Sequence, residues 1–259
     1  MLQLKKLKLK HDYRLQALIE RLNAIGNVIA VASSKGGVGK TITACMLSLI
    51  LAKQKYKTGL LDLDFTGPAC HIVFGVRPEE VMLEEEEGVK PVRITSNLYF
   101  MSITFFTKDR MIPLRGAEQV SVLRELVVIT NWGSLDFLII DTPPTLSDII
   151  IELSKYGKKI NFLVVTTRSR LALNSTRKII EYLKASKANI LGLIENMSLI
   201  EDEMVKDFCK RLAVKFLGKI PFDNELEGCY GNINKLLKTK FAFHLERIVM
   251  EVLRSIMSL

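Results

Sequence analysis

The sequence lacks the cysteine pairs that build disulfide frameworks and zinc sites. Its four cysteines, Cys45, Cys70, Cys209 and Cys229, are widely spaced, and no CxxC occurs. This spacing argues against a disulfide framework and against a zinc site within one chain. A chain of 259 residues with 48% apolar residues can bury a large core, so we expect a globular protein of the reducing cytosol.

Long hydrophobic runs are also absent. No apolar run approaches the roughly 20 residues that span a bilayer. The first 25 residues carry charge throughout, without the apolar centre of a secretory signal. We therefore expect a cytoplasmic protein.

Internal repeats and long linkers rich in proline, glycine or serine are missing as well. Instead, β-branched apolar runs alternate with segments whose apolar residues recur at helical spacing. The strand-like runs are NVIAVAS, TGLLDLD, LYFMSI, LDFLIIDT, NFLVVTT, NILGLIEN and VKFLGKI. The alternation predicts an α/β fold with a doubly wound, mainly parallel sheet and helices on both faces. We expect one domain over residues 27–259.

The first 26 residues form a separate, basic extension. Apolar residues at 15, 18, 19, 22 and 25 make a helical stripe, and MLQLKKLKLK precedes it. The stripe predicts either a helix that packs on the domain or an amphipathic, cationic contact for membrane or nucleic acid. The formal charge of +9 favours anionic partners, and residues 155–187 hold nine Lys or Arg against one acid. That second basic segment is either a solvated helical face or an anion-binding surface.

A glycine-rich loop follows the first strand-like run. Ser34 to Thr41 read SKGGVGKT, directly before a helical pattern. Glycines let consecutive backbone N–H groups surround oxygens, and a helix N-terminus adds a positive dipole end. The loop therefore predicts an ATP site made by Lys35, Gly36, Gly37, Val38, Gly39, Lys40, Thr41 and Ile42. Lys40 would contact the β- and γ-phosphates, and Thr41 would offer a hydroxyl to Mg²⁺.

Acidic residues end two further strand-like runs. LLDLDFTGPA contains Asp62 and Asp64, and FLIIDTPP contains Asp141. Mg²⁺ prefers oxygen ligands and often reaches carboxylates through water. We predict a Mg²⁺ site at Thr41, Asp62 and Asp141. Asp64 is either a further Mg²⁺ arm or a helix cap before TGPAC.

The segment KGGVGKT resembles the deviant Walker A loop of the MinD/ParA/Mrp group of P-loop ATPases. Further segments resemble the Mrp branch, whose members are scaffold and carrier ATPases linked to iron–sulfur cluster assembly. These segments span residues 27–225 and read LDLDFTGPA, MSITFF, RGAEQ, WGSLDFLIIDTPP, IENMS and FLGKIPFD.

The resemblance implies a role for each of several residues. Lys35 and Lys40 would act on the phosphates, Lys35 by reaching across a nucleotide-sandwich dimer. Asp64 would orient the attacking water. Asn196 would hydrogen-bond the adenine edge, and Pro221 would flank the base. The switch segments would be residues 62–68 and 141–148, and hydrolysis would be slow without a partner.

The sequence departs from the Mrp pattern in two places. Mrp proteins carry a CxxC shortly after ENMS that holds a bridging cluster, whereas this chain continues LIEDEMVKDFC. We therefore do not expect this chain alone to hold an iron–sulfur cluster, and we interpret Cys209 and Cys229 as structural. The family's PPGTGD is PPTLSD here, so Thr145 and Ser147 replace glycines.

Two functional hypotheses follow. The first is a Mg²⁺-dependent ATPase of the Mrp type that works as a homodimer or as a heterodimer with a related ATPase, with an iron–sulfur client. The second is a positioning ATPase resembling MinD or ParA, whose ATP-bound dimer binds membrane or DNA through its basic segments.

Overall fold

The fold is seen in a computed structural model that describes residues 13–110, 112–200 and 202–257. The basic run at residues 1–10 lies outside the described residues, so its contact with membrane or nucleic acid stays a prediction. Among the described residues, no helix combines the length and apolarity needed to cross a bilayer.

Strands and helices alternate along the chain. The strands are β1 (Asn27–Ser33), β2 (Thr58–Asp62), β3 (Val92–Arg93), β4 (Leu98–Ser102), β5 (Phe137–Asp141), β6 (Ile160–Thr166), β7 (Asn189–Ser198) and β8 (Phe216–Pro221). The helices are α2 (Tyr13–Ala24), α3 (Lys40–Lys53), α4 (Cys70–Phe74), α5 (Thr104–Thr107), α6 (Ala117–Ile129), α7 (Asp148–Ser154), α8 (Arg170–Ala185), α9 (Met204–Arg211), α10 (Ile233–Leu236) and α11 (Lys240–Met257). Two 3₁₀ turns, η1 (Gly157–Lys159) and η2 (Glu227–Cys229), complete them.

The strands form one eight-stranded sheet in the order β3-β4-β2-β5-β1-β6-β7-β8. Every pairing is parallel except that of β3 with β4. The sequence therefore predicted the doubly wound parallel sheet correctly. It missed β3, because two residues are too few to give a periodic pattern.

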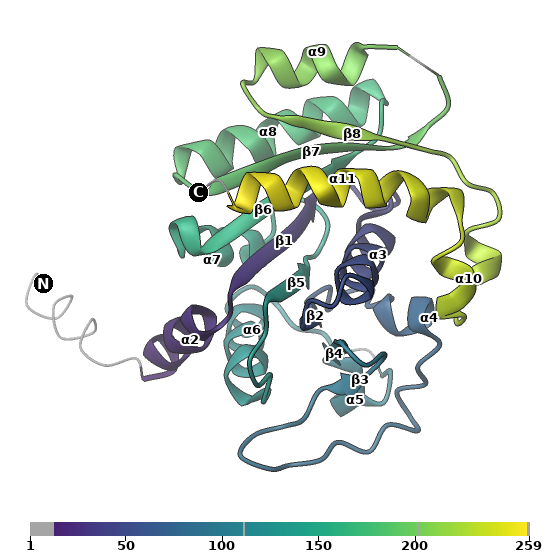
Figure 1. Cartoon of the computed structure of the whole chain (residues 1–259). Coiled ribbons are helices and arrows are strands. Elements are labelled where there is room, and N and C mark those ends of the chain that lie inside the picture. The colour runs from purple at the N-terminus through teal and green to yellow at the C-terminus, as the bar shows by residue number, and fades with distance from the viewer. Residues whose placement is uncertain (1–12, 111, 201, 258–259) are drawn as a thin grey trace, which may run out of the picture.

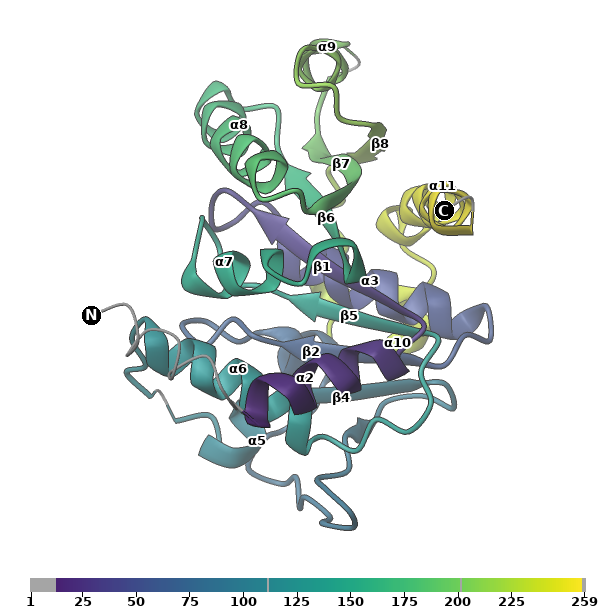
Figure 2. The ribbon, with the colours of Figure 1, turned by 90° about the vertical axis from the view of Figure 1, so that its left-hand side faces the viewer.

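Helices cover both faces of this sheet. In Figures 1 and 2, α3 and α11 lie on one face, and α6, α7 and α8 lie on the other. This arrangement covers the strands on both sides, and every residue of β2, β5 and β6 is buried.

Helix α3 is the most enclosed helix near the glycine-rich loop. It contacts β1, β2, β5, α4 and α11, and residues 42–52 are all buried. Helices that are apolar all round belong in a protein interior. The loop that precedes α3 is therefore attached to a helix in the centre of the core.

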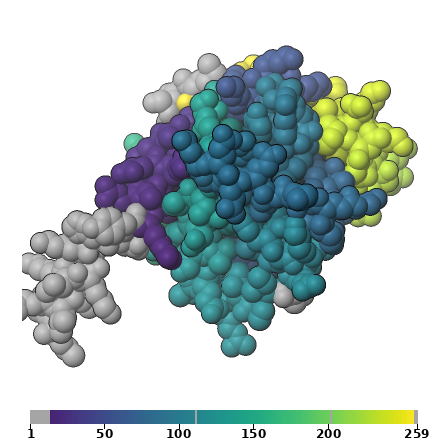
Figure 3. All heavy atoms as spheres, turned by 90° about the horizontal axis from the view of Figure 1, so that it is seen from below, coloured from purple at the N-terminus to yellow at the C-terminus, as the bar shows by residue number. Residues whose placement is uncertain are grey.

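The two ends of the described chain pack on the domain. Leu18 and Leu22 of α2 are buried, and α2 contacts α6, so the packed-helix interpretation of the stripe is confirmed. Helix α11 buries Leu245 and Val249 against α3 and β8, as its amphipathic pattern predicts. Seen from below, purple α2 and the yellow C-terminal segment flank a blue and teal surface (Figure 3).

The tight packing around Gly59 gives a test of this core. A Cβ at Gly59 of β2 would lie 2.7 Å from Leu135 Cδ1 and 2.8 Å from Trp132 Cζ3. We expect Gly59→Ala to lower the free energy of unfolding by about 1–3 kcal/mol through overpacking. Urea unfolding followed by the fluorescence of Trp132, the one tryptophan of the chain, measures this.

Gly228→Ala is the matched control, because a Cβ there meets no atom within 4 Å. Equal stability of the two variants would contradict the packing of Trp132 on β2.

Candidate functional site

The glycine-rich loop joins the end of β1 to the start of α3. Gly37 and Gly39 adopt positive φ angles of 74° and 82°, a region that favours glycine. A Cβ on Gly39 would also lie 2.1 Å from Asn196 Nδ2. The loop therefore needs glycine at position 39 for both its backbone conformation and the space it leaves.

Ser34 stands where the usual phosphate-loop pattern has its first glycine, and the structure gives a reason. Its hydroxyl is buried and lies 2.9 Å from Thr176 Oγ1 and 3.2 Å from the Ala172 carbonyl oxygen, both on α8. The serine thus attaches the start of the loop to the helix that follows β6.

Asn196 supports the loop from the end of β7. Its Nδ2 donates to the Val38 carbonyl at 2.9 Å, and the side chain is buried. The predicted contact of Asn196 with an adenine edge would have to be made by the rest of its amide, and it stays a prediction. Sequence reasoning gave no signal for this second, loop-supporting contact.

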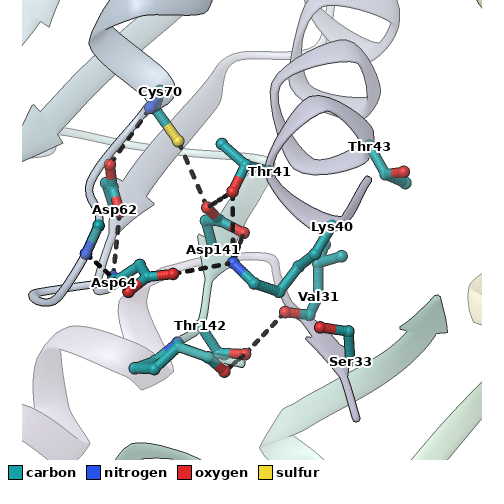
Figure 4. Close-up of polar contacts among 12 residues, drawn as sticks. Val31, Ser33, Lys40, Thr41, Thr43, Asp62, Asp64, Cys70, Asp141 and Thr142 are labelled. Atoms are coloured by element: carbon teal, nitrogen blue, oxygen red, sulfur yellow. Dashed lines mark hydrogen bonds and ion pairs between the residues drawn. The ribbon is translucent and has the colours of Figure 1, made fainter. Parts of the chain in front are cut away.

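Two of the three predicted carboxylates, Asp64 and Asp141, contact Lys40, and Asp62 lies beside them, as Figure 4 shows. Asp62 and Asp141 are register partners on the adjacent parallel strands β2 and β5, so their side chains meet at one edge of the sheet. Lys40 Nζ lies 2.6 Å from Asp141 Oδ1 and 3.7 Å from Asp64 Oδ2. Thr41 Oγ1 donates to Asp141 Oδ2 at 2.7 Å.

Asp64 also holds the segment that follows β2. Its Oδ1 accepts from Thr66 Oγ1 at 2.8 Å and from the Gly67 amide at 3.2 Å. The helix-cap alternative for Asp64 is wrong, because α4 begins after Ala69 without a side-chain cap. Asp64 instead holds the local turn through one oxygen and faces Lys40 with the other, and its catalytic role stays a prediction.

The charges at this edge do not balance. Asp62, Asp64 and Asp141 are all buried, and Lys40 is the buried ammonium among them. Burial and the charge of Asp141 raise the pKa of Asp62 to about 7. Burial also raises the pKa of Asp141 although Lys40 opposes it. Burial lowers the pKa of Lys40, but the three carboxylates, Asp141 foremost, together raise it above its usual value. This excess of carboxylate over ammonium fits a divalent cation such as Mg²⁺.

A cavity of about 620 Å³ opens above the loop, a size typical of small-molecule sites. Its walls include the predicted residues Lys35, Gly36, Gly37, Gly39, Lys40, Thr41, Ile42, Asp64, Asn196 and Pro221. Val38, Asp62 and Asp141 are buried beneath these walls.

Several residues of the cavity wall escaped sequence reasoning. Ile72 of α4, Phe222, Tyr230 and Phe241 line the side away from the loop. Only Phe222 had a sequence signal, because it follows Pro221 in the IPFD segment. Ile72 and Phe241 reach the cavity because α4 and α11 pack against α3, and Tyr230 directly follows η2.

The segment after Asp141 carries a strained residue. Thr145 has a φ angle of 69°, and its amide donates to the Ser33 carbonyl at 2.9 Å. A β-branched residue in this region is an outlier, and such strain clusters at functional sites. Ser147, the second replaced glycine, caps α7 by accepting from the Ile150 amide at 3.4 Å.

The buried charge of Asp62 predicts a pH dependence of stability. A carboxyl group whose pKa is about 7 when folded and about 3.9 when unfolded binds more protons in the folded state across that window. Its contribution to the free energy of unfolding is therefore present at low pH and is lost as the pH rises towards 7. We expect metal-free Asp62→Asn to lose less stability than the unmodified chain between about pH 4 and about pH 7, the edges of that window.

Urea unfolding in a chelator at the two pH values measures the difference. Asp136→Asn, a change of an exposed aspartate, serves as the control and should follow the unmodified chain. Equal losses in all three proteins would contradict the buried, uncompensated charge.

Comparisons with known proteins agree with this geometry. A family model described as ParA, NUBPL iron-transfer P-loop NTPase, matches residues 24–257. Over 239 residues the chain is 34% identical to a cytosolic Fe-S cluster assembly factor NUBP1 homolog of Brugia malayi, covering 84% of this chain and 77% of that protein. It is 33% identical over 221 residues to an iron-sulfur cluster carrier protein of Aquifex aeolicus, covering 80% of this chain and 60% of that protein.

Solved structures share the fold. A nucleotide-binding protein of Archaeoglobus fulgidus in complex with ADP aligns with a TM-score of 0.67 and 27% identity, over 90% of this chain and 92% of that chain. The cell division ATPase MinD of Pyrococcus furiosus aligns with a TM-score of 0.66 and 22% identity, over 88% and 99% of the two chains, which shows the fold alone.

The resemblance that the motifs indicated is therefore confirmed. The family match covers most of the chain. It includes the glycine-rich loop and the carboxylates at the edge of β2 and β5. This protein belongs to the ParA/NUBPL family of iron-transfer P-loop NTPases.

Proposed function

We propose that this chain is a Mg²⁺-dependent ATPase of iron–sulfur cluster assembly that acts as a nucleotide-gated dimer in the cytoplasm. One observation carries the proposal: Lys40 lies buried between Asp141 and Asp64 at the floor of a cavity framed by a glycine-rich loop. The names of the relatives, cytosolic assembly factors and a cluster carrier, support the cellular role and location.

Binding of ATP begins with the loop. Amides from Gly36 to Thr41 and the start of α3 would surround the phosphates. The Lys40 ammonium would leave Asp141 for the phosphates, which frees a carboxylate as the negative charge of the nucleotide arrives. Thr41, Asp62 and Asp141 would hold Mg²⁺, which neutralises phosphate charge when it is bound.

Hydrolysis would depend on Asp64 and Lys35. Asp64 is placed to accept a hydrogen bond from an attacking water with the oxygen that faces Lys40. Its other oxygen holds Thr66 and Gly67, so a change at the γ-phosphate would reach the segment after β2. Lys35 lines the cavity and would add positive charge in a partner's site.

An apolar rim supports dimerisation at the same edge of the sheet. Leu146, Leu171, Leu199, Ile200 and Phe222 are each at least 40% exposed and follow β5, β6, β7 and β8. Exposed apolar side chains gathered near a site are typical of an interface. The partner would be a second copy of this chain or a related ATPase.

We do not propose that this chain carries a bridging cluster. The segment after β7 has no cysteine pair. Cys209 is buried in α9 and Cys229 is half-buried in η2. We propose that the chain drives assembly on a client or on a cysteine-bearing partner.

A positioning ATPase is the second candidate, favoured by the surface of α8. Arg170, Lys178 and Lys187 are exposed on or next to this helix. Binding to DNA or anionic vesicles that requires ATP and falls steeply with salt would favour this candidate over the first.

Replacement of Lys40 tests the nucleotide site. We expect Lys40→Ala to weaken binding of ATP with Mg²⁺ by about 100-fold or more, because a charge-assisted contact to phosphate is lost. Isothermal titration calorimetry measures the affinity, and Trp132 fluorescence checks that the variant is folded. Lys53→Ala at the exposed end of the same helix is the control. Unchanged affinity in Lys40→Ala would place the nucleotide elsewhere.

Replacement of Asp64 tests the gating. We expect Asp64→Ala to bind ATP but hydrolyse it about 100-fold more slowly, because the attacking water loses its acceptor. The closed dimer should therefore accumulate with ATP and appear in light scattering after gel filtration. Asp207→Ala, on the exposed face of α9, should behave like the unmodified chain. Rapid hydrolysis by Asp64→Ala would assign the water to another residue.

A further inference from the structure

Two cysteine thiols meet the magnesium-site carboxylates beneath the loop. Cys70 is the first residue of α4, and Cys45 lies inside α3. Ligand atoms of Asp62, Cys70 and Asp141 all lie within 4.8 Å of one another. The four side chains are buried to within 1% exposure. Figure 4 shows Cys70 pointing at Asp141 from the side opposite Lys40.

Cys70 is the centre of this group. Its Sγ lies 3.7 Å from Asp141 Oδ2, and its amide donates to Asp62 Oδ2 at 3.4 Å. Cys45 lies close enough to Cys70 for each thiol to affect the pKa of the other. One thiol and two carboxylates therefore occupy one volume, with a second thiol beside them.

The donor set differs from a pure magnesium site. Mg²⁺ takes oxygen ligands, whereas thiolates select softer ions such as Zn²⁺, Co²⁺ and Fe²⁺. The buried carboxylates already exceed the buried ammonium, so a divalent cation would reduce the charge imbalance. A thiol that coordinates such a cation gives up its proton even where burial otherwise keeps it neutral.

We propose that Asp62, Cys70 and Asp141, with Cys45 as an adjacent fourth donor, form a site for a thiophilic divalent cation. The ion would bind through Asp141 Oδ2, the oxygen that faces Cys70, while Oδ1 stays with Lys40. Each coordinating thiol loses one proton to solvent and forms one metal–sulfur bond. No electron is transferred, so no oxidant is needed.

The site shares Asp62 and Asp141 with the proposed Mg²⁺–ATP site but does not depend on hydrolysis. Two divalent cations held by the same two carboxylates would lie close together and repel each other. The thiophilic ion and Mg²⁺–ATP would therefore weaken each other's binding, by the same factor in both directions. Nucleotide binding would then release the ion, and the ion would favour the empty state.

Titration of the full, metal-free chain with CoCl₂ under anaerobic conditions tests the proposal. We expect a thiolate-to-cobalt charge-transfer band that saturates at one ion per chain. Cys70→Ser should lose the band and weaken cobalt binding by about 100-fold, and Cys45→Ser should reduce the band's intensity. Cys209→Ser, which removes a buried thiol on α9, should keep both the band and the affinity.

Several results would overturn the site. The site would be contradicted if the unmodified chain gave no band or if Cys70→Ser kept the band. It would also be contradicted if the band disappeared only in Cys209→Ser. If Cys70→Ser does not fold, Cys45→Ser and Cys70→Ala carry the same test. Calorimetry with ATP and Mg²⁺ on the same preparation separates the two proposals. ATP binding without the cobalt band would contradict the thiophilic site alone. The cobalt band without ATP binding would contradict the proposed ATPase alone.

Discussion

The buried ion pair between Lys40 and Asp141 is the contact on which the site depends. Its two members come from α3 and β5, and the 2.6 Å bond joins them where both elements are fully enclosed. An unpaired charge at this depth would be strongly destabilising. The pair therefore holds the start of α3 against the end of β5.

The sheet explains why these groups meet. Parallel strands end at a common edge, and the register of β2 with β5 sets Asp62 beside Asp141. β1 lies between β5 and β6, so the loop emerges at the middle of that edge. Ligands in open α/β sheets bind at such edges. The chemistry of the site thus follows from the order of the strands as much as from the residues that end them.

The departures from the known patterns each have a local setting in the structure. Ser34 stands in place of the first glycine of the usual phosphate-loop pattern and is bonded to α8. Thr145, which replaces a glycine of the Mrp pattern, holds a conformation that glycine would adopt without strain. After β7, exposed Leu199 and Ile200 occupy the segment where a cysteine pair is absent. These changes leave the loop and its carboxylates intact and alter the surface that a partner would meet. The loop and its carboxylates thus follow the Mrp pattern, while the segments around them differ from it.

The sequence by itself determined the parallel sheet, the loop and the residues that end β2 and β5, because period, glycine spacing and strand-terminal acids are local signals. It also determined α2 and α11 through their apolar stripes. Only the tertiary structure decided that Cys45 and Cys70 meet, that Asn196 supports Val38, and that Ser34 reaches α8. Each of these contacts joins residues from different elements. Their distances are set by how strands and helices stack, and no periodic pattern within one segment records that stacking.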